Sequence, residues 1–369
     1  MISKRIQKID SSELRAAFAQ AQKIQNSINF SIGFPAIDTP KTIKQAGIKA
    51  IEDGFTKYMP TDGLPALKEK ILKKLKKQNK LKIKGINNIT VTPGVTGAFA
   101  AIYISLFDPQ DEVIIFDPYF LIYKELCKIV DAKPVIIDTY PTFQIDLKQV
   151  EKKITQKTKA IVINSPNNPT GVIYPKETLI KLAKIAQKNN LIVISDEIYE
   201  EFCYQKRHFS IGSVYENTLT LNGFSKTYGM TGWRLGYVAG PEEIISAINE
   251  IQPYLFFSSS SVAQMAAIKA LDMNVKKTID LHKKLHDFAL KNLSPKFEIC
   301  GGDGAFYFLL KAPNGNGKKF VQAALKRKLI MLPGTLFSEK NTHFRISYAT
   351  SAENLKKGIK ILNELAEKY

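Results

Sequence analysis

Seven short, almost wholly apolar runs recur between residues 88 and 239, and segments with helical periodicity, such as 96–107 and 175–190, separate most of them. The runs are NITVT (88–92), EVIIF (112–116), PVIID (134–138), AIVIN (160–164), LIVIS (191–195), TLTLN (218–222) and LGYVA (235–239). Strands that are apolar on both faces are typical of a parallel sheet covered by helices on each side. The order of elements therefore predicts an α/β protein with a mostly parallel, seven-stranded sheet and crossover helices.

The pattern changes after about residue 265, where Lys-rich amphipathic stretches come before shorter apolar segments. This mixture predicts a smaller α+β domain in the last third of the chain. The first 40 residues are too few to form a core of their own, so we expect them to join that domain. The 369 residues are thus expected to form a large domain at 41–265 and a small domain made of 1–40 and 266–369.

The formal net charge of +19 raises the question of a nucleic-acid partner. Only six of the 53 basic residues are arginine, and the lysines are spread along amphipathic segments such as 66–85. Base recognition and bidentate phosphate binding favour arginine. We therefore interpret the charge as a lysine-rich solvated surface that attracts small anions, and we expect no nucleic-acid partner.

The cysteines, the histidines and the hydropathy of the chain argue against a disulfide-bonded, a metal-binding and a membrane protein. The three cysteines, Cys127, Cys203 and Cys300, lie far apart, which fits a reducing cytoplasm. His282 and His286 are four residues apart, but no acidic or cysteine partner makes them a convincing zinc pair, so we expect no metal. There is neither an 18-residue apolar run nor a signal-peptide core, so we expect no membrane and a cytoplasmic location. The basic, amphipathic first turns leave an organelle-targeting segment as an alternative.

Residues that suit a ligand follow the ends of the first expected strands, and in an open α/β sheet the ligand lies outside the carboxyl ends of the strands. After 88–92, glycines flank Val95 and Thr96, whose amides at a helix N-terminus suit a phosphate, although an ordinary turn is the alternative. After 112–116, Phe120 belongs to an aromatic cluster that could stack on a flat ring, although such clusters more often form core. After 160–164, Asn168 offers an amide, although its surroundings are also typical of a simple turn.

Charged side chains follow the later strands. Asp196 and Glu197 come directly after 191–195, where a buried carboxylate needs a cationic partner, and Tyr199 follows within one turn. Lys226 comes after 218–222 among glycines and aromatic residues, where desolvation lowers the pKa of its amine and frees it as a nucleophile.

Two anion-binding groups, Ser225 and Arg234, flank this lysine. The strand ends together therefore offer a phosphate site, a stacking ring, an amide, a buried carboxylate, a phenol and a lysine. Pyridoxal phosphate requires such a set, because it needs a Schiff-base lysine, an acid beside its ring nitrogen and phosphate ligands.

Six motifs spread over nearly the whole chain point in the same direction. They are I-G-F-P-A-I-D-T-P (32–40), K-Y-M-P-T-D-G (57–63), N-N-P-T-G (167–171), D-E-I-Y (196–199), S-K-T-Y-G-M-T-G-W-R-L-G (225–236) and F-R-I-S-Y-A (344–349). In this order and spacing they resemble the class I and II aminotransferases, which have the aspartate aminotransferase fold, fold type I of the pyridoxal-phosphate enzymes.

The resemblance implies roles for the matching residues. Lys226 would hold the cofactor as a Schiff base and shuttle the proton. Asp196 would pair with the ring nitrogen, and Asn168 and Tyr199 would bond the 3′-oxygen of the cofactor. Phe120 would stack on the ring.

The resemblance also implies ligands for the phosphate and the substrate. The phosphate ligands would be the backbone of Val95 and Thr96 and the side chains of Ser225 and Arg234. Tyr58 would reach the phosphate in a neighbouring subunit, which implies a homodimer with shared active sites. Arg345, with Asn168 nearby, would bind the substrate α-carboxylate, and Gly33 would close over it. A buried arginine that is purely structural is the alternative for Arg345.

The sequence lacks the second basic residue that many dicarboxylate-specific members use for the distal carboxylate of the substrate. One subgroup uses an arginine from the partner subunit, but none occurs in the corresponding segment, 251–261. Another uses a lysine where this chain has Thr96. We expect a pocket bordered by Tyr254, Phe256 or Phe257, with a broad range of neutral and aromatic donors or aspartate, and 2-oxoglutarate as acceptor.

Two other functions remain open at this point. A C–S β-lyase or a cyclopropane-forming synthase could use the same scaffold and the same lysine. A DNA-binding regulator of this family would need an added helix-turn-helix domain, and the roughly 30 residues before 32–40 are too few for one.

Overall fold

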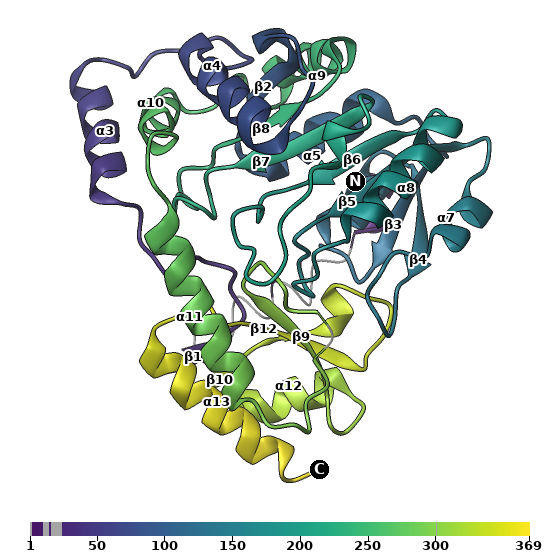
Figure 1. The fold of residues 1–369 in the computed structure, drawn as a ribbon, viewed down its shortest axis with the longest axis vertical. Coiled ribbons are helices and arrows are strands. Elements are labelled where there is room, and N and C mark those ends of the chain that lie inside the picture. The colour runs from purple at the N-terminus through teal and green to yellow at the C-terminus, as the bar shows by residue number, and fades with distance from the viewer. Residues whose placement is uncertain (1, 10–14, 16–23, 300) are drawn as a thin grey trace.

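The computed structural model describes residues 2–9, 15, 24–299 and 301–369 (Figure 1). Cys300 and parts of the expected 1–40 segment lie outside the described residues. None of the described helices has both the length and the apolar character that crossing a membrane requires.

The expected seven-stranded sheet is present, and each of the seven apolar runs forms one of its strands. The strands are β2 (Ile89–Thr92), β3 (Glu112–Asp117), β4 (Lys133–Asp138), β5 (Thr158–Asn164), β6 (Ile192–Asp196), β7 (Thr218–Gly223) and β8 (Gly236–Ala239). Their order in the sheet is β2-β8-β7-β6-β5-β3-β4. Only β8 runs antiparallel to its neighbours. The carboxyl ends of the other strands therefore meet at one edge of the sheet.

Helices cover both faces of this sheet, which explains why most of its strands are apolar at successive positions. Alternate residues of β3 show the division: Val113 and Ile115 join the core on one face, whereas Ile114 and Phe116 join the core on the other. The first face is covered by α5 (Gly94–Leu106), α6 (Ile122–Ile129) and α9 (Glu242–Leu255), and the second by α7 (Leu147–Lys153) and α8 (Lys176–Lys188).

A further core lies beside β2 and β8, where α3 (Lys41–Glu52), α4 (Pro65–Lys74) and α10 (Ser261–Ala270) pack together. The boundary expected at residue 265 falls inside α10, whose Ala266, Ala267 and Ala270 are buried in this core. We propose that the large domain extends from residue 41 to the end of α10.

The last third of the chain forms a three-stranded antiparallel sheet of order β11-β12-β9, covered by helices (Figure 1). Its elements are β9 (Tyr307–Lys311), β11 (Leu332–Pro333), β12 (His343–Ser347), α11 (Lys276–Asn292), α12 (Gly317–Lys326) and α13 (Ala352–Ala366). The N-terminal strand β1 (Ile28–Asn29) pairs in parallel with β10 (Leu329–Ile330), and Phe30 is buried in the same core. The remaining short elements are α1 (Lys4–Gln7), a π-helical turn (Leu75–Asn79) and 3₁₀ turns at Ile86–Asn88, Ile211–Ser213 and Gly334–Leu336. We propose that residues near 28–40 and those after α10 form the small domain.

Candidate active site

A cavity of about 560 Å³ opens at the carboxyl ends of the sheet strands, between the sheet and the β9–β12 part of the molecule. Its lining includes every cofactor and α-carboxylate ligand expected from the sequence except Tyr58. These residues are Gly33, Val95, Thr96, Phe120, Asn168, Asp196, Tyr199, Ser225, Lys226, Arg234 and Arg345. The structure therefore brings together side chains that are separated by more than 300 positions in the sequence.

Asp196 is the last residue of β6, and its carboxylate is buried at the base of the cavity. The Tyr123 hydroxyl donates to Oδ2 at 2.8 Å, and the backbone N–H of Ile198 donates to Oδ1 at 3.2 Å. Burial raises the pKa of Asp196 to about 6, and these two hydrogen bonds oppose the rise. Because no cation among the described residues is in ion-pair contact with it, the carboxylate suits a positively charged group of a ligand.

Lys226 lies three residues after the end of β7, and its Nζ donates to the backbone carbonyl of Gly33 at 2.8 Å. Burial, together with the positive charges of Arg345 and Arg234, lowers the pKa of this amine to about 8. A minor but appreciable fraction of the amine is therefore uncharged near neutral pH, and this neutral form is the nucleophile.

Arg345, in β12, lies with its guanidinium between two aromatic rings, at 4.4 Å from the centroid of Tyr307 and 4.7 Å from that of Phe337. Its Nη1 donates to Asn168 Oδ1 at 2.8 Å, and its Nη2 donates to the backbone carbonyl of Ser31 at 2.5 Å. Its Nε is buried without a partner, and no carboxylate of the described residues forms an ion pair with it. A planar, uncompensated guanidinium in a cavity suits the carboxylate of a small substrate.

The N-terminus of α5 closes one end of the cavity. Gly94 begins the helix at φ +73°, and a Cβ there would lie 2.8 Å from Nη2 of Arg234, so only glycine allows the arginine to lie against this turn. The first-turn amides of the helix, including those of Val95 and Thr96, have no partner within the helix. Amides and the Arg234 guanidinium thus converge where an anion would be stabilised.

Two phenols and an amide form the wall between the carboxylate and the guanidinium. The hydroxyls of Tyr199 and Tyr307 are 2.9 Å apart and buried. The backbone N–H of Asn168 donates to Asn164 Oδ1 at 2.7 Å, which fixes the side chain that accepts from Arg345. The Phe120 ring lines the cavity nearby, 5.9 Å from the ring of Tyr123.

Comparison with known proteins decides the family. A family model described as aminotransferase class I and II matches residues 25–362. The chain belongs to this family. It is 38% identical, over the whole of both chains, to a protein from Methanocaldococcus jannaschii named probable aspartate aminotransferase. It is 36% identical to an aspartate/prephenate aminotransferase from Thermus thermophilus, over 97% of each chain.

A solved structure shows the same fold. The aspartate aminotransferase from Thermus thermophilus with maleate superposes with a TM-score of 0.95 at 34% identity, over 99% of each chain. The fold class and the enzyme class expected from the sequence are therefore confirmed, and the protein is an aminotransferase that acts on amino acids.

Several residues in the cavity of this aminotransferase were not identified from the sequence. Tyr123 lies three residues after Phe120 in the same aromatic cluster, and its sequence position does not show that its hydroxyl bonds Asp196. Tyr307 and Phe337 enclose Arg345 from segments in which no local pattern marks them as site residues. Ser31 contributes only a backbone carbonyl, which carries no sequence signal.

Tyr58 and the aromatic residues of 251–261 lie outside the cavity of their own chain. Tyr58 is 83% exposed and packs on Phe257 with ring centroids 4.5 Å apart. Tyr254 is 85% exposed, and Phe256 lines a neighbouring cavity that also reaches Arg234. The cavity of the single chain therefore does not include Tyr254, Phe256 or Phe257, and their place at the border of the substrate pocket stays a prediction.

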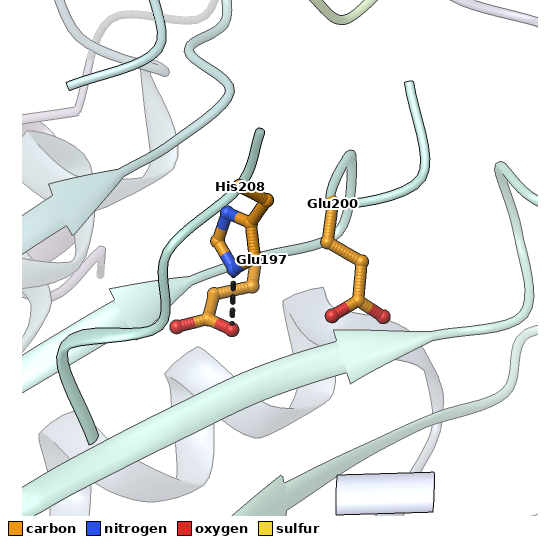
Figure 2. A group of neighbouring side chains, drawn as sticks. All are labelled: Glu197, Glu200 and His208. Atoms are coloured by element: carbon orange, nitrogen blue, oxygen red, sulfur yellow. Dashed lines mark hydrogen bonds and ion pairs between the residues drawn. The ribbon is translucent and has the colours of Figure 1, made fainter. Parts of the chain in front are cut away.

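A buried ion-pair network lies behind the site, directly after Asp196. Figure 2 shows Glu197, Glu200 and His208 close together, with His208 Nε2 2.9 Å from Glu197 Oε2. Asn79 donates to both carboxylates, and the Lys74 ammonium forms an ion pair with Glu200. Although the acidic and histidine atoms lie within 4.8 Å of one another, an ammonium group already supplies the cation, so we interpret the cluster as an ion-pair network.

The sequence predicts a cationic partner for the carboxylates of Asp196 and Glu197. In the structure this partner is His208, and it pairs with Glu197. Glu197 Oε1 also accepts from Ser195 and Ser210, whereas Asp196 faces the cavity. Burial raises the pKa of Glu197 and lowers that of His208, and the pairing opposes both effects: His208 lowers the pKa of Glu197, and Glu197 raises that of His208, so each member favours the charged form of the other. The turn that carries Asp196 and Tyr199 is thus anchored from its far side.

Proposed function

We propose that this aminotransferase binds pyridoxal 5′-phosphate in the cavity and moves an amino group between an L-amino acid and a 2-oxo acid, with 2-oxoglutarate as acceptor. The observation that carries the proposal is the meeting in one cavity of Lys226, Asp196 and Arg345. Lys226 has an amine with a lowered pKa, Asp196 has a carboxylate without an ion-paired cation, and Arg345 has a guanidinium without an ion-paired carboxylate.

The free thiols of Cys127 and Cys203 support a cytoplasmic location.

The residues present fit each part of this cofactor. Asp196 would lie against the ring nitrogen, and Phe120 would stack on the ring. Tyr199 and Asn168 would bond its 3′-oxygen. The phosphate would be held at the end of α5 by the amides of Val95 and Thr96, with the side chains of Ser225 and Arg234.

The chemistry follows from the positions of these groups. When bound, pyridoxal phosphate supplies an electron sink for the substrate's α-carbon. Lys226 Nζ would hold the cofactor covalently, and its free amine would take up and return the proton of the substrate's α-carbon. Asp196 would keep the ring nitrogen protonated, and Arg345 would fix the α-carboxylate beneath Gly33, so that the proton would lie within reach of Lys226.

The experiment that tests this function is a panel of the twenty amino acids mixed one by one with the yellow holoenzyme. Amino transfer converts the absorbance of the bound cofactor to that of its amine form, and adding 2-oxoglutarate should reverse the change. Release of ammonia and pyruvate without an oxo acid would instead establish a β-lyase. If no amino acid changes the spectrum, the proposed function is wrong.

We propose further that the preferred donors have neutral side chains, although the relatives described above are named for aspartate. Among the described residues that line the cavity, the only cations are Lys226, Arg234 and Arg345, each of which has a role already. The rest of the substrate end is apolar, with Phe34, Leu332 and Phe337. A second carboxylate would therefore find no fixed cation in the pocket, and burying it would cost more than burying a neutral side chain. The second carboxylate of 2-oxoglutarate would have to be met by water or by one of the many lysines of the chain.

We expect kcat/KM for alanine, methionine or phenylalanine to equal or exceed that for aspartate under one set of conditions. Thr96→Lys should raise kcat/KM for aspartate by about tenfold, the effect of one hydrogen bond to a charged group. Thr96→Met is the control, because methionine is nearly as long as lysine but has no charge. It should not raise kcat/KM for aspartate. A hundredfold preference of the wild type for aspartate would mean that an unrecognised basic group reaches the pocket.

The active species that we propose is a homodimer with shared sites. Large apolar side chains that lie exposed on the single chain include Ile48, Ile51, Tyr58, Tyr254 and Phe257. A second copy of the chain would cover these residues and bring its Tyr58 to the phosphate end of the neighbouring cavity.

Mixing two defective variants tests this arrangement. Tyr58→Phe should weaken cofactor binding, and Lys226→Ala should be inactive. When the two are co-expressed with different tags, the heterodimer contains one site with both natural residues, so it should regain about half of the wild-type activity. Light scattering should give twice the chain mass of 41.4 kDa. A heterodimer no more active than its parents, or an active monomer, would contradict the shared site.

A further inference from the structure

The two phenols in the cavity wall form a pair that links the cofactor end of the site to the substrate end. Tyr307 is the first residue of β9, and Tyr199 lies in the turn after β6. Their hydroxyl oxygens are 2.9 Å apart, and within the described part of the chain neither hydroxyl has another hydrogen-bond partner. The ring of Tyr307 also lies against the guanidinium of Arg345.

The two hydroxyl hydrogens of this pair limit the hydrogen bonds that it can form. Burial raises the pKa of both phenols, so both keep their hydrogen at neutral pH. Only one of the two hydrogens can lie between the two oxygens. The other must be donated elsewhere, and the direction of the shared bond decides which tyrosine donates it.

The surroundings of Tyr307 decide that direction. A Cβ at Gly33 would lie 1.9 Å from the Tyr307 oxygen, so the backbone of the 31–34 segment covers this hydroxyl and leaves little room for a third group. The positive charge of Arg345 opposes the rise of the pKa of both phenols, so it does not distinguish between them. The crowding at Tyr307 does, because the Tyr199 oxygen is then the acceptor left for the Tyr307 hydrogen, and this arrangement leaves the hydrogen of Tyr199 for the cavity.

We propose that Tyr307 is a positioning residue, whose hydroxyl donates to the Tyr199 oxygen and thereby aims the Tyr199 hydrogen at the 3′-oxygen of the bound cofactor. This inference rests on the proposed cofactor role of Tyr199. It assigns to Tyr307 a contribution through Tyr199 that is separate from the packing of its ring against Arg345.

The test compares wild type, Tyr307→Phe, Tyr199→Phe and the double variant as loaded enzymes, by titrating the visible absorbance of the bound cofactor against pH. A hydrogen bond to the 3′-oxygen stabilises the form in which this oxygen is more negative. Losing the orientation of Tyr199 should therefore raise the midpoint, by about 0.5 to 1 pH unit for one neutral hydrogen bond. Tyr199→Phe should raise it at least as much, and Tyr307→Phe should add nothing in that background.

Two controls separate this effect from damage to the site. Tyr307→Phe keeps the ring beside Arg345, so KM for the amino acid should change less than twofold. Phe337→Leu removes the ring on the other face of Arg345 without touching Tyr199, so it should raise KM and leave the midpoint unchanged. Equal thermal melting temperatures of Tyr307→Phe and wild type would show that the fold is kept.

The outcomes are distinct. A midpoint that does not move in Tyr307→Phe, or a shift that persists in the Tyr199→Phe background, would overturn the inference. If the wild type itself takes up no cofactor with a visible band, the proposed function fails instead.

Discussion

Replacing Lys226 with alanine should abolish amino transfer while leaving the fold intact. The side chain supplies both the covalent link to the cofactor and the base that moves the α-proton, and loss of a positioned base alone costs up to about 10⁴-fold in rate. No other lysine among the described residues lines the cavity, so none can substitute. The measurement is the single-turnover rate of the cofactor's spectral change, together with borohydride reduction of wild type and mass spectrometry of the labelled peptide.

Lys283→Ala provides the control for this variant. Lys283 is an exposed lysine on α11 that pairs with Asp287, far along the chain from the site. Its replacement should leave the rate unchanged, because exposed ion pairs of this kind contribute little. A label on a lysine other than Lys226, or an alanine variant that retains near-normal turnover, would contradict the central assignment.

Replacing Asp196 with asparagine should lower kcat by several orders of magnitude. The amide has nearly the shape of the carboxylate but cannot keep the ring nitrogen protonated, so stabilisation of the carbanion-like transition state is lost. Stopped-flow measurement of the half-reaction with a good donor gives the rate. A loss of less than about tenfold, which corresponds to roughly 1.4 kcal/mol, would place Asp196 outside the reacting centre.

A stability measurement on Asp196→Asn should show that its loss of kcat does not come from unfolding. Burial raises the pKa of Asp196 to about 6, above its unfolded value, so its ionisation opposes folding as pH rises through that range. The neutral amide avoids this cost, and the cofactor-free Asp196→Asn protein should be at least as stable as wild type at pH 7 in a denaturant melt. Tyr123→Phe, which removes only the hydrogen bond to Oδ2, should give a much smaller kinetic defect.

The sheet could be predicted from the sequence because both of its faces are buried. Most of its strands are apolar at successive positions, and Ile114 and Ile115 of β3 show the reason by packing into cores on opposite faces. The residues at the strand ends could also be predicted, because a buried strand that ends in Asp196 or precedes Lys226 places an ionisable group at a known edge.

The opposite wall of the cavity could not be predicted in the same way. Tyr307 and Phe337 reach the site only because β9 and β12 fold back over the sheet edge, and no local periodicity encodes that approach. Ser31 contributes a backbone carbonyl, which every residue type has, so its role could not be predicted from the amino-acid sequence. His208 is a lone histidine in a loop, and only the structure shows that it pairs with Glu197.

The attachment of the segment that contains Ser31 and Gly33 has a consequence for the synthesis of this chain. The Ser31 carbonyl accepts from Arg345, 314 positions later, and the Gly33 carbonyl accepts from Lys226, 193 positions later. The adjacent strand β1 pairs with β10, which is likewise made long after it. The segment emerges from the ribosome before the partners that hold it, so a nascent chain halted before β12 can form the sheet but not the substrate pocket.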